Sequence, residues 1–346
     1  MAVVETNAGN EGAVTIGSDT QPLVSVILPT YPNDVRMPYL GQAIASALAQ
    51  TYTNLELIVS DNSMSDRVRD LVASFGDARV RYRHNGGNIG PLLNALVAYR
   101  EAQGPLIATL FDDDIWEPTF LEKLVPPMAA DDTLTMSFCD HWVISADGTI
   151  DHRATEINTR RWKRDRLAPG VHRPFIDLAV VDRAIPVGMG AVFRKSAIDW
   201  DDFPEEVFVY DLWLGYLAAR DGGGAFYCPE RLTRYRVHEE MMTSNTRYDS
   251  YAVYCYDRFI RDERLKPLRR QVLAESAGFH AGLGITLLEE GRRHEARRHL
   301  VWAFRHRPQL KALAGILLSF LPQKPAVHIG RARRIRAWFP DFSPRR

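Results

Sequence analysis

The chain has 346 residues, with 43 Lys or Arg and 43 Asp or Glu, so its formal net charge is zero. Apolar residues make up 46 % of the sequence, which is typical of a globular protein and excludes a mainly disordered chain. A neutral balance also argues against a protein that coats nucleic acid, and we expect no nucleic-acid partner. The length exceeds what one hydrophobic core usually supports, so we expect a main domain and a smaller one.

The cysteines and the apolar runs indicate where in the cell the protein is located. Cys139, Cys228 and Cys255 are odd in number and far apart, which favours reduced thiols in a cytoplasmic protein. The segment before Pro22 contains no Lys or Arg and no sustained apolar run, so we expect residues 1–21 to be a disordered lead-in. The longest apolar stretch, at 310–322, is too short to span a bilayer.

Basic charge is concentrated at the C-terminal end of the chain. From Tyr251 onward, Lys and Arg exceed Asp and Glu by 12, and the first 250 residues carry the opposite excess. A basic surface could face an anionic membrane, an acidic partner or the acidic domain of a homodimer mate, or the two regions could neutralise each other within one chain. The tail at 328–342 mixes Arg with aromatic residues but is broken by Pro340, which favours a solvated terminus over peripheral membrane contact.

Short apolar strands alternate with amphipathic helices from Pro22 onward, the pattern of an α/β domain. The predicted elements are strands at 23–30, 55–61, 80–85 and 105–111, with helices at 39–50, at 67–75 and within 85–103. Three of these strands end at Thr30, Asp61 and Phe111. Because the carboxyl ends of parallel strands share one edge of a sheet, we expect a nucleotide-binding crevice there.

Three acids, Asp112, Asp113 and Asp114, directly follow the fourth predicted strand. Carboxylates so close together are electrostatically costly without a cation, and oxygen ligands favour Mg²⁺ or Mn²⁺ over Zn²⁺ or copper. Alternatively, Asp114 caps a helix that opens at Trp116. Capping accounts for one carboxylate and not for three, so the run predicts a metal site.

The second half of the domain no longer shows the regular alternation of strands and helices. A strand is predicted at 134–145, a helix at 209–223 and a returning strand at 225–238, and an Arg-rich segment at 151–183 without clear periodicity is a candidate lid or acceptor loop. Everything from about Ser250 reads as helical. We therefore expect a catalytic domain at 22–249 and a basic helical subdomain at 250–346, the latter a candidate homodimer surface.

Four motifs resemble, in order, those of the family 2 glycosyltransferases of GT-A fold. They are VSVILPTYPN, LELIVSDNSMSD, NGGNIGPLLNALVA and FDDDIWEPTFLEKL, and the resemblance covers roughly Pro22 to Asn245. It implies a Rossmann-like, mainly parallel sheet flanked by helices, followed by the C-terminal helical subdomain. It also implies an inverting, metal-dependent enzyme that moves a sugar from a nucleotide-diphosphate sugar, with UDP- or TDP-sugars favoured, to an acceptor hydroxyl.

The resemblance also implies roles for single residues in binding the donor. Those expected to contact the base, ribose, sugar or phosphates are Thr30, Tyr31, Asp61, Asn88, Asn94, Asp112 and Arg236. Asp113 would coordinate Mn²⁺ or Mg²⁺, and His238 would complete the metal shell or hold a phosphate oxygen. Two alternatives stay open, since Asp61 could form an Asx-turn and Asn94 could face solvent.

Asp211 is the candidate general base, because it aligns with the Asp of the family's Glu-Asp pair at the start of a helix. It could also cap that helix, and the pair Glu205 and Glu206 is a weaker alternative base. The loop PVGMGAVFRK resembles the stretch that shapes the sugar and acceptor pocket, where Gly188 and Gly190 allow close backbone approach.

Two other functions compete with the transferase. Departures from the family pattern at Pro32, Asn62 and Tyr210 keep open a non-catalytic nucleotide-sugar-binding scaffold that recruits a partner through the C-terminal helices. A sugar-1-phosphate nucleotidylyltransferase would need a Gly-rich phosphate loop after the first strand, and the sequence PTYPNDVRMPYL offers none. The residues do not identify the acceptor.

Overall fold

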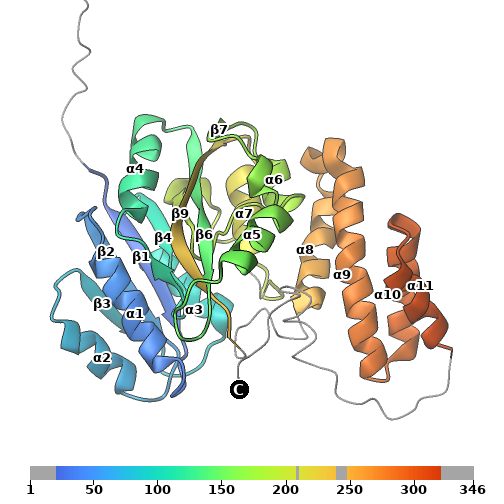
Figure 1. Ribbon diagram of the computed structural model, residues 1–346, viewed down its shortest axis with the longest axis horizontal. Helices are drawn as coiled ribbons and strands as arrows, with labels where there is room; N and C mark the ends of the chain where they lie inside the picture. Colours follow the sequence, from blue (N-terminus) through green and yellow to red (C-terminus); the bar gives the residue numbers. More distant parts are fainter. Residues whose placement is uncertain (1–20, 208–209, 239–247, 321–346) are drawn as a thin grey trace, which may run out of the picture.

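The computed structural model describes residues 21–207, 210–238 and 248–320 (Figure 1). The lead-in expected before Gln21 and the tail after Phe320 lie outside the described residues. The elements are β1 Val24–Thr30, α1 Met37–Leu48, β2 Leu55–Asp61, α2 Arg67–Phe75, β3 Val80–His84, α3 Pro91–Glu101, β4 Leu106–Thr109, β5 Ile115–Trp116, α4 Phe120–Ala130, β6 Leu134–Ile144, α5 His152–Arg161, η1 Arg164–Arg166, β7 Gly170–His172, α6 Ile176–Val180, β8 Ala191–Arg194, η2 Lys195–Ala197, α7 Tyr210–Ala219, β9 Gly224–Arg236, α8 Tyr248–Arg261, η4 Glu263–Leu268, α9 Arg269–Glu289, α10 Arg293–His306 and α11 Leu310–Leu318.

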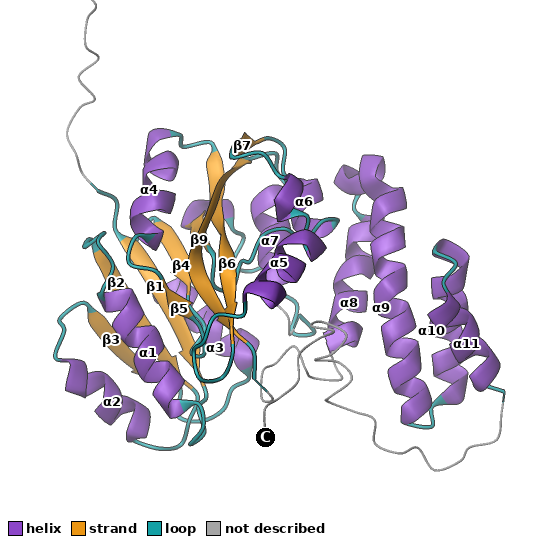
Figure 2. Cartoon of the chain, viewed as in Figure 1, coloured by secondary structure: helices purple, strands orange, loops and turns teal. Residues whose placement is uncertain are grey.

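The described strands form one sheet in the order β3-β2-β1-β4-β8-β6-β9-β5, with β7 also pairing with β9. Strands β3, β2, β1 and β4 are parallel, whereas β8 runs antiparallel to both β4 and β6. Helices lie on both faces of the sheet (Figure 2). The predicted α/β fold with flanking helices is confirmed, and the sheet is mixed, with its β3-β2-β1-β4 part parallel.

The alternation of side chains along β1 explains why helices cover both faces. Val24, Val26 and Leu28 point into a core formed with α1, α2 and α4, whereas Ile27 points into a second core with α3 and α7. Successive side chains of a strand face opposite sides of the sheet, and all four of these are fully buried. A strand buried on both faces therefore reads as a continuous apolar run.

The carboxyl ends of the parallel strands are level, as the sequence predicts. Thr30 at the end of β1 pairs with Asp61 at the end of β2, and Asp61 pairs in turn with His84 of β3. Strand β4 ends at Thr109, two residues before the expected Phe111. The acids that follow β4 thus come to the same edge of the sheet as the residues after β1 and β2.

The Arg-rich segment at 151–183 differs from the expected loop, since it contains α5, η1, β7 and α6. Helix α5 shows little apolar periodicity because polar residues occupy its buried face, among them Thr155 and Asn158. The guanidinium of Arg164 anchors the segment, donating to Asp140 Oδ1 at 2.7 Å and to Asn158 Oδ1 at 2.6 Å. Polar contacts rather than an apolar stripe therefore stabilise this part of the fold.

The described residues from 248 to 320 are mainly helical, as predicted, and α8 shares a core with the sheet. Cys255, Tyr256 and Phe259 of α8 lie in the same apolar cluster as α3 and α7, and the Tyr256 hydroxyl donates to the Val180 carbonyl of α6 at 2.7 Å. The apolar core therefore crosses the domain boundary expected near residue 249, and that boundary stays a prediction.

Small residues bring α9, α10 and α11 close together. Ala281 of α9 packs with Ala303 of α10 and Ala312 of α11 in a cluster of their own. A Cβ added at Gly284 of α9 would lie 2.5 Å from the Leu300 side chain of α10, so only glycine allows this approach. A turn at Gly291 separates α9 from α10. Figure 1 shows α9, α10 and α11 beyond α8 on the right.

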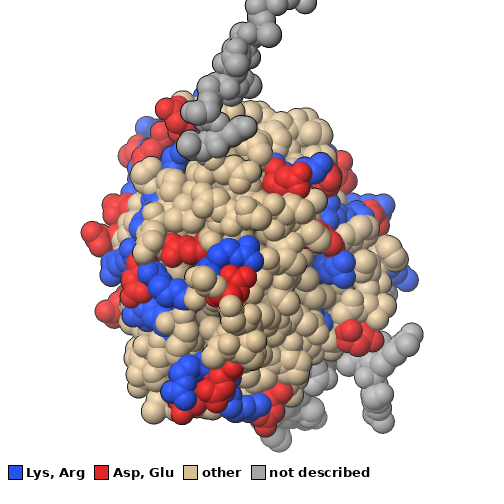
Figure 3. Space-filling view, turned by 90° about the vertical axis from the view of Figure 1, so that its left-hand side faces the viewer, with Lys and Arg blue, Asp and Glu red and all other residues tan. Residues whose placement is uncertain are grey.

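Figure 3 turns the left-hand side of Figure 1 towards the viewer, and on this face acidic and basic side chains lie next to one another. On α2, for example, Arg69 pairs with Asp66 at 3.0 Å, and both side chains are exposed. Exposed pairs of this kind contribute about 0–1 kcal/mol each. Charge on this face is therefore balanced locally.

Two observations bear on the predicted location of the chain. Among the helices of the described ranges, none combines the length and the apolar character needed to cross a bilayer. The three cysteines are free thiols, and all are buried. The cytoplasmic location stays a prediction.

The buried Arg164–Asp140 ion pair generates a stability prediction. Arg164→Ala should lower the free energy of unfolding by about 3 kcal/mol or more, because the Asp140 carboxylate would stay buried without its main partner. Lys123→Ala removes the exposed ion pair with Glu230 and should cost less than about 1 kcal/mol. Urea denaturation of both variants measures the difference, and equal effects would contradict the assignment of Arg164 as the anchor.

Candidate active site

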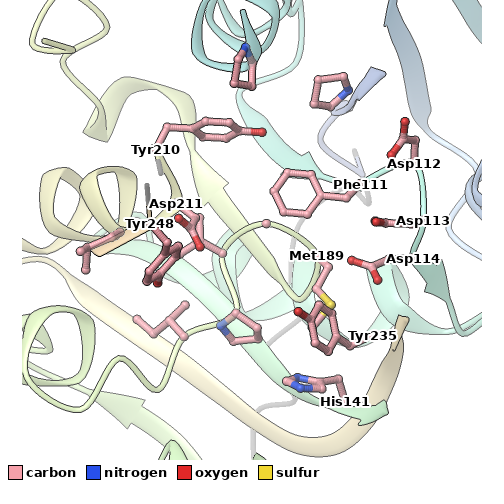
Figure 4. Close-up of a pocket in the computed structure, with 18 of the residues that line it drawn as sticks. Phe111, Asp112, Asp113, Asp114, His141, Met189, Tyr210, Asp211, Tyr235 and Tyr248 are labelled. Carbon is pink, nitrogen blue, oxygen red and sulfur yellow. The ribbon is translucent and has the colours of Figure 1, made fainter. Parts of the chain in front are cut away.

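A cavity of about 560 Å³ opens at the carboxyl edge of the parallel strands. Its walls come from the ends of β1 and β4, the start of α3, β6, the loop before β8, and the starts of α7 and α8. Figure 4 shows the acids at one end of this cavity and Asp211 and Tyr248 at the other, with Phe111 and Met189 between them. The volume suits a ligand of several hundred daltons.

The Asp112 carboxylate is held by two groups from the β1 side of the sheet. The Thr30 hydroxyl donates to Asp112 Oδ2 at 2.6 Å, and the Arg36 guanidinium forms an ion pair with Oδ1. Burial raises the pKa of Asp112, against the opposing charge of Arg36. Thr30 and Asp112, both predicted site residues, are therefore in direct contact.

Asp113 lies between a histidine and an arginine side chain. His238 Nε2 lies 3.0 Å from Asp113 Oδ2, and Arg36 lies 3.8 Å from the same oxygen. Although burial opposes ionisation, the hydrogen bond from His238 and the charge of Arg36 hold the pKa of Asp113 below its usual value. The structure thus brings together the two predicted metal ligands.

Asp114 does not cap a helix, so the capping alternative is wrong. Helix α4 begins at Phe120 and its N-cap residue is Thr119, whereas Asp114 Oδ1 accepts from the backbone N–H of Arg236 at 2.9 Å. Asp114 Oδ2 is buried and has no hydrogen-bond partner in the part of the chain that the structure describes. Burial raises the pKa of Asp114 well above its usual value, and the neighbouring Asp113 adds to this effect.

The residues present fit a divalent cation that takes part of its shell from a ligand. Across the described ranges, no group of three His, Cys, Asp or Glu side chains could hold a metal unaided. Mg²⁺ characteristically uses one or two carboxylates and completes its shell with water and phosphate oxygens. Asp113 and His238 would supply such a partial site, and the Asp114 oxygen that has no partner among the described residues belongs to the same loop as Asp113.

An asparagine network lines the β1 side of the cavity. Asn94 Oδ1 accepts from the Ser60 hydroxyl and from Asn85 Nδ2, both at 2.7 Å, and only 2 % of the residue is exposed. The alternative that Asn94 faces solvent is therefore wrong. Asn88 Oδ1 accepts from the Gly90 N–H at 2.9 Å. Both Asn88 and Asn94 line the cavity, as predicted, and Asn62 lines it beside them.

Asp61 does not reach the cavity wall. Its carboxylate accepts from the backbone N–H of Ser63 at 2.7 Å, which is an Asx-turn, and from the Tyr82 hydroxyl at 2.8 Å. Among the residues described, Asp61 does not line the cavity. The alternative role left open by the sequence is thus observed, and contact with a nucleobase stays a prediction.

Arg236 is the clearest departure from the predicted site. Its guanidinium donates to the Asp113 carbonyl at 2.8 Å, to the Ala146 carbonyl at 3.0 Å and to Gln42 Oε1 at 2.6 Å, and only 1 % of the residue is exposed. With these protein partners, Arg236 does not face a phosphate in this arrangement. It braces the acid loop instead.

Asp211 lies at the far end of the cavity, half-buried at the start of α7. Burial raises the pKa of Asp211, while the N–H of Leu212 and the charge of Arg183 oppose the shift. The alternative acids Glu205 and Glu206 are exposed and lie outside the cavity lining of the described chain. Tyr31, 54 % exposed, lines the cavity on the β1 side.

Sequence reasoning missed two residues. Arg36 pairs with Asp112 and Asp113, and its position in the loop after the first strand was an available signal. His141 interrupts the apolar strand β6 and lines the cavity, and neither of its ring nitrogens has a hydrogen-bond partner within the described residues. Burial lowers the pKa of His141 to about 3, so the ring is neutral.

The glycine loop before β8 shapes the cavity as the sequence predicts. A Cβ added at Gly188 would lie 2.1 Å from the Phe111 ring, and one at Gly190 would lie 2.7 Å from Pro186. Phe111 also meets the Tyr210 ring edge-on, with centroids 6.2 Å apart. Glycine at 188 therefore allows the Phe111 ring to lie between the two ends of the cavity.

Comparisons with known proteins agree with this geometry. A family model described as glycosyl transferase family 2 matches residues 25–199. An uncharacterized glycosyltransferase of Rickettsia typhi is 26 % identical over 239 residues, covering 67 % of this chain and 69 % of its own. The UDP-Glc:alpha-D-GlcNAc-diphosphoundecaprenol beta-1,3-glucosyltransferase WfgD of Escherichia coli is 37 % identical over 106 residues, covering 31 % and 41 %.

Two solved structures share the fold. The crystal structure of S. aureus TarS 1–349 with UDP-GlcNAc has a TM-score of 0.59 and 14 % identity, covering 86 % of this chain and 89 % of that one. The mannosyltransferase PcManGT of Pyrobaculum calidifontis, with GDP-Man and Mn²⁺, has a TM-score of 0.56 and 20 % identity, covering 93 % and 86 %.

Contact between Gly188 and Phe111 generates a second prediction. Gly188→Ala should destabilise the protein by about 1–3 kcal/mol and weaken ligand binding, because the added methyl group displaces the Phe111 ring. Gly278→Ala is the matched control, since its Cβ would meet nothing within 4 Å and alanine favours α9. Thermal unfolding and nucleotide titration of both variants test this, and similar behaviour of the two would contradict it.

Proposed function

The chain belongs to glycosyltransferase family 2 and transfers a sugar from a nucleotide-sugar donor, and we propose that it does so by an inverting, metal-assisted single displacement. One observation carries the proposal. Asp113, paired with His238, and Asp211 face the same cavity from opposite ends (Figure 4). This separates a site for the leaving group from a base for the acceptor.

The donor's diphosphate would lie at the acid end of the cavity. Asp113 and His238 would hold Mn²⁺ or Mg²⁺, which as a Lewis acid stabilises the negative charge that develops on the departing diphosphate. The positive charge of Arg36 lies beside them. A UDP-sugar is the favoured donor, with TDP-sugars next, because TarS is seen with UDP-GlcNAc and the Escherichia coli relative is named for UDP-Glc. The Mn²⁺ in PcManGT supports a divalent cation.

Asp211 would act as the base for the acceptor. The acceptor oxygen attacks the anomeric carbon from the face opposite the diphosphate, its proton passes to the Asp211 carboxylate, and the bond from the anomeric carbon to the phosphate oxygen breaks. Attack from the opposite face inverts the anomeric configuration. A base at the far end of the cavity from the acids is consistent with that direction of attack.

The role of Asp113 predicts a loss of metal-dependent binding. Asp113→Asn should weaken the affinity for UDP in the presence of Mn²⁺ at least tenfold, because one ligand charge is lost. In EDTA, the variant and the parent chain should bind UDP equally weakly. The exposed Asp132, in the turn before β6, provides the control Asp132→Asn, which should bind as the parent does. Isothermal calorimetry measures all three, and an unchanged Asp113→Asn would exclude this residue as the metal ligand.

The role of Asp211 predicts a change in turnover without a change in donor binding. Asp211→Asn should lower the rate of UDP release from UDP-sugars, with water as the acceptor, by about 10²–10⁴-fold. Its UDP affinity should match that of the parent chain, because Asp211 lies away from the acid loop. Glu205→Gln, at an exposed carboxylate outside the cavity lining, should keep full activity. Near-normal turnover in Asp211→Asn would show that another group takes the proton.

The raised pKa of Asp211 predicts the acid side of the pH profile. Because the base must be ionised, kcat/KM should fall as the pH drops through the pKa of this carboxyl, and burial places that point above the usual value for Asp. The profile of UDP release between about pH 3 and pH 8, which includes both the ordinary Asp pKa and a raised one, measures it. An acid limb at or below the ordinary Asp pKa of about 3.9 would contradict the role of Asp211.

A further inference from the structure

Arg183 is a cationic side chain whose role the proposed function does not account for. It lines the cavity at the end that holds Asp211 and Tyr248, and it is half-buried there. Its guanidinium lies 4.4 Å from the centre of the Trp162 ring and 4.9 Å from that of Phe279. Two rings from separate elements, the end of α5 and the middle of α9, thus fix the position of one charge.

The guanidinium donates no hydrogen bond and forms no ion pair within 4.0 Å in the part of the chain that the structure describes. Contact with two aromatic faces holds the cation but leaves its five N–H donors unused. Arg183 also has a φ of +52°, a backbone conformation that costs a non-glycine residue free energy. Such strain persists where the surrounding structure holds a functional side chain in place.

A second arginine lies near Arg183, outside the cavity lining of the described chain, with its Cζ 5.3 Å from the centre of the same Trp162 ring. Arg161, at the end of α5, has its pKa lowered by burial and by the charge of Arg183, so the two guanidinium groups are close enough to repel each other. The Asp211 carboxylate attracts Arg183 but makes no ion pair with it. Two neighbouring cations and an unused donor fork are the features of a site for a multiply charged oxyanion, and the planar fork of arginine matches phosphate oxygens.

We propose that Arg183 binds a phosphate group of the acceptor, so that the acceptor is a sugar phosphate or diphosphate rather than a neutral saccharide. The inference rests on the proposed function, which places the donor's diphosphate at the acid end and the acceptor beside Asp211. The oxyanion at Arg183 therefore belongs to the acceptor. A phosphate group can carry two negative charges and a carboxylate only one, so a phosphate matches the two positive charges of Arg183 and Arg161 better.

The test uses the full chain with its donor end first saturated with UDP and Mn²⁺, followed by calorimetric titration with octyl phosphate and octyl diphosphate. Octyl glucoside and sodium octanoate are the neutral and carboxylate probes. The parent chain should bind the two phosphates more tightly than either control probe. Arg183→Gly should weaken phosphate binding at least tenfold. Arg183→Lys keeps the charge but not the planar fork, so its phosphate affinity should lie between those of the parent chain and Arg183→Gly.

Two features keep this test informative. Glycine adopts a φ of +52° without strain, so Arg183→Gly removes the guanidinium while keeping the backbone, and its UDP affinity and melting temperature report that it is folded. Arg258→Ala is the matched control, because Arg258 also lies on an aromatic ring, 4.9 Å from the centre of Tyr254, but outside the cavity lining of the described chain. It should bind all four probes as the parent does.

The outcomes separate this inference from the proposed function. If UDP binds with Mn²⁺ but the phosphates bind no better than octyl glucoside, or bind equally to Arg183→Gly, the acceptor inference is overturned and the donor site stands. Tighter binding of octanoate than of octyl phosphate would also overturn it. If UDP itself fails to bind, the proposed function fails and this inference falls with it.

Discussion

Three aspartate side chains crowded at the end of β4 determine how the rest of the site is arranged. Carboxyl groups this close, shielded from water, need hydrogen-bond or charged partners, and those partners come from distant parts of the chain. Arg36 follows β1 and pairs with Asp112, whereas His238 follows β9 and pairs with Asp113. The acid loop therefore joins the two sides of the sheet. A divalent cation bound there would balance the remaining negative charge of the acids and of a donor diphosphate.

The C-terminal helices contribute to the other end of the cavity. Tyr248 at the start of α8 lines it, and Phe279 of α9 supports the Arg183 guanidinium. The apolar core runs from the sheet into α8 and α9 without a break. If Arg183 binds the acceptor as proposed, the packing of Phe279 against its guanidinium would link the C-terminal helices to the reaction. A homodimer through these helices and a membrane contact of the tail stay predictions.

The sequence predicted the parallel strands and the meeting of Thr30 and the acids at one edge, because buried parallel strands have apolar runs whose ends can be read directly. The place of Asn94 in the cavity came from the family resemblance. It did not predict that Arg236 points away from the cavity, since the partners that hold it, such as Gln42, are far away in the sequence. Helix α5 was missed because its buried face is polar. Arg36 was missed because its contact with the acids exists only in the folded chain. The family match favours the enzyme over the scaffold and the nucleotidylyltransferase.

The central claim is that Asp113 and His238 hold a divalent cation on the donor's diphosphate while Asp211 faces the opposite end of the cavity. The most direct measurement is the anomalous scattering of manganese in a crystal of the chain grown with UDP and Mn²⁺. The account predicts one strong peak within about 2.3 Å of an Asp113 oxygen and in contact with the diphosphate, which lies between that carboxylate and Asp211. A manganese peak away from Asp113, or UDP bound outside the cavity, would contradict it.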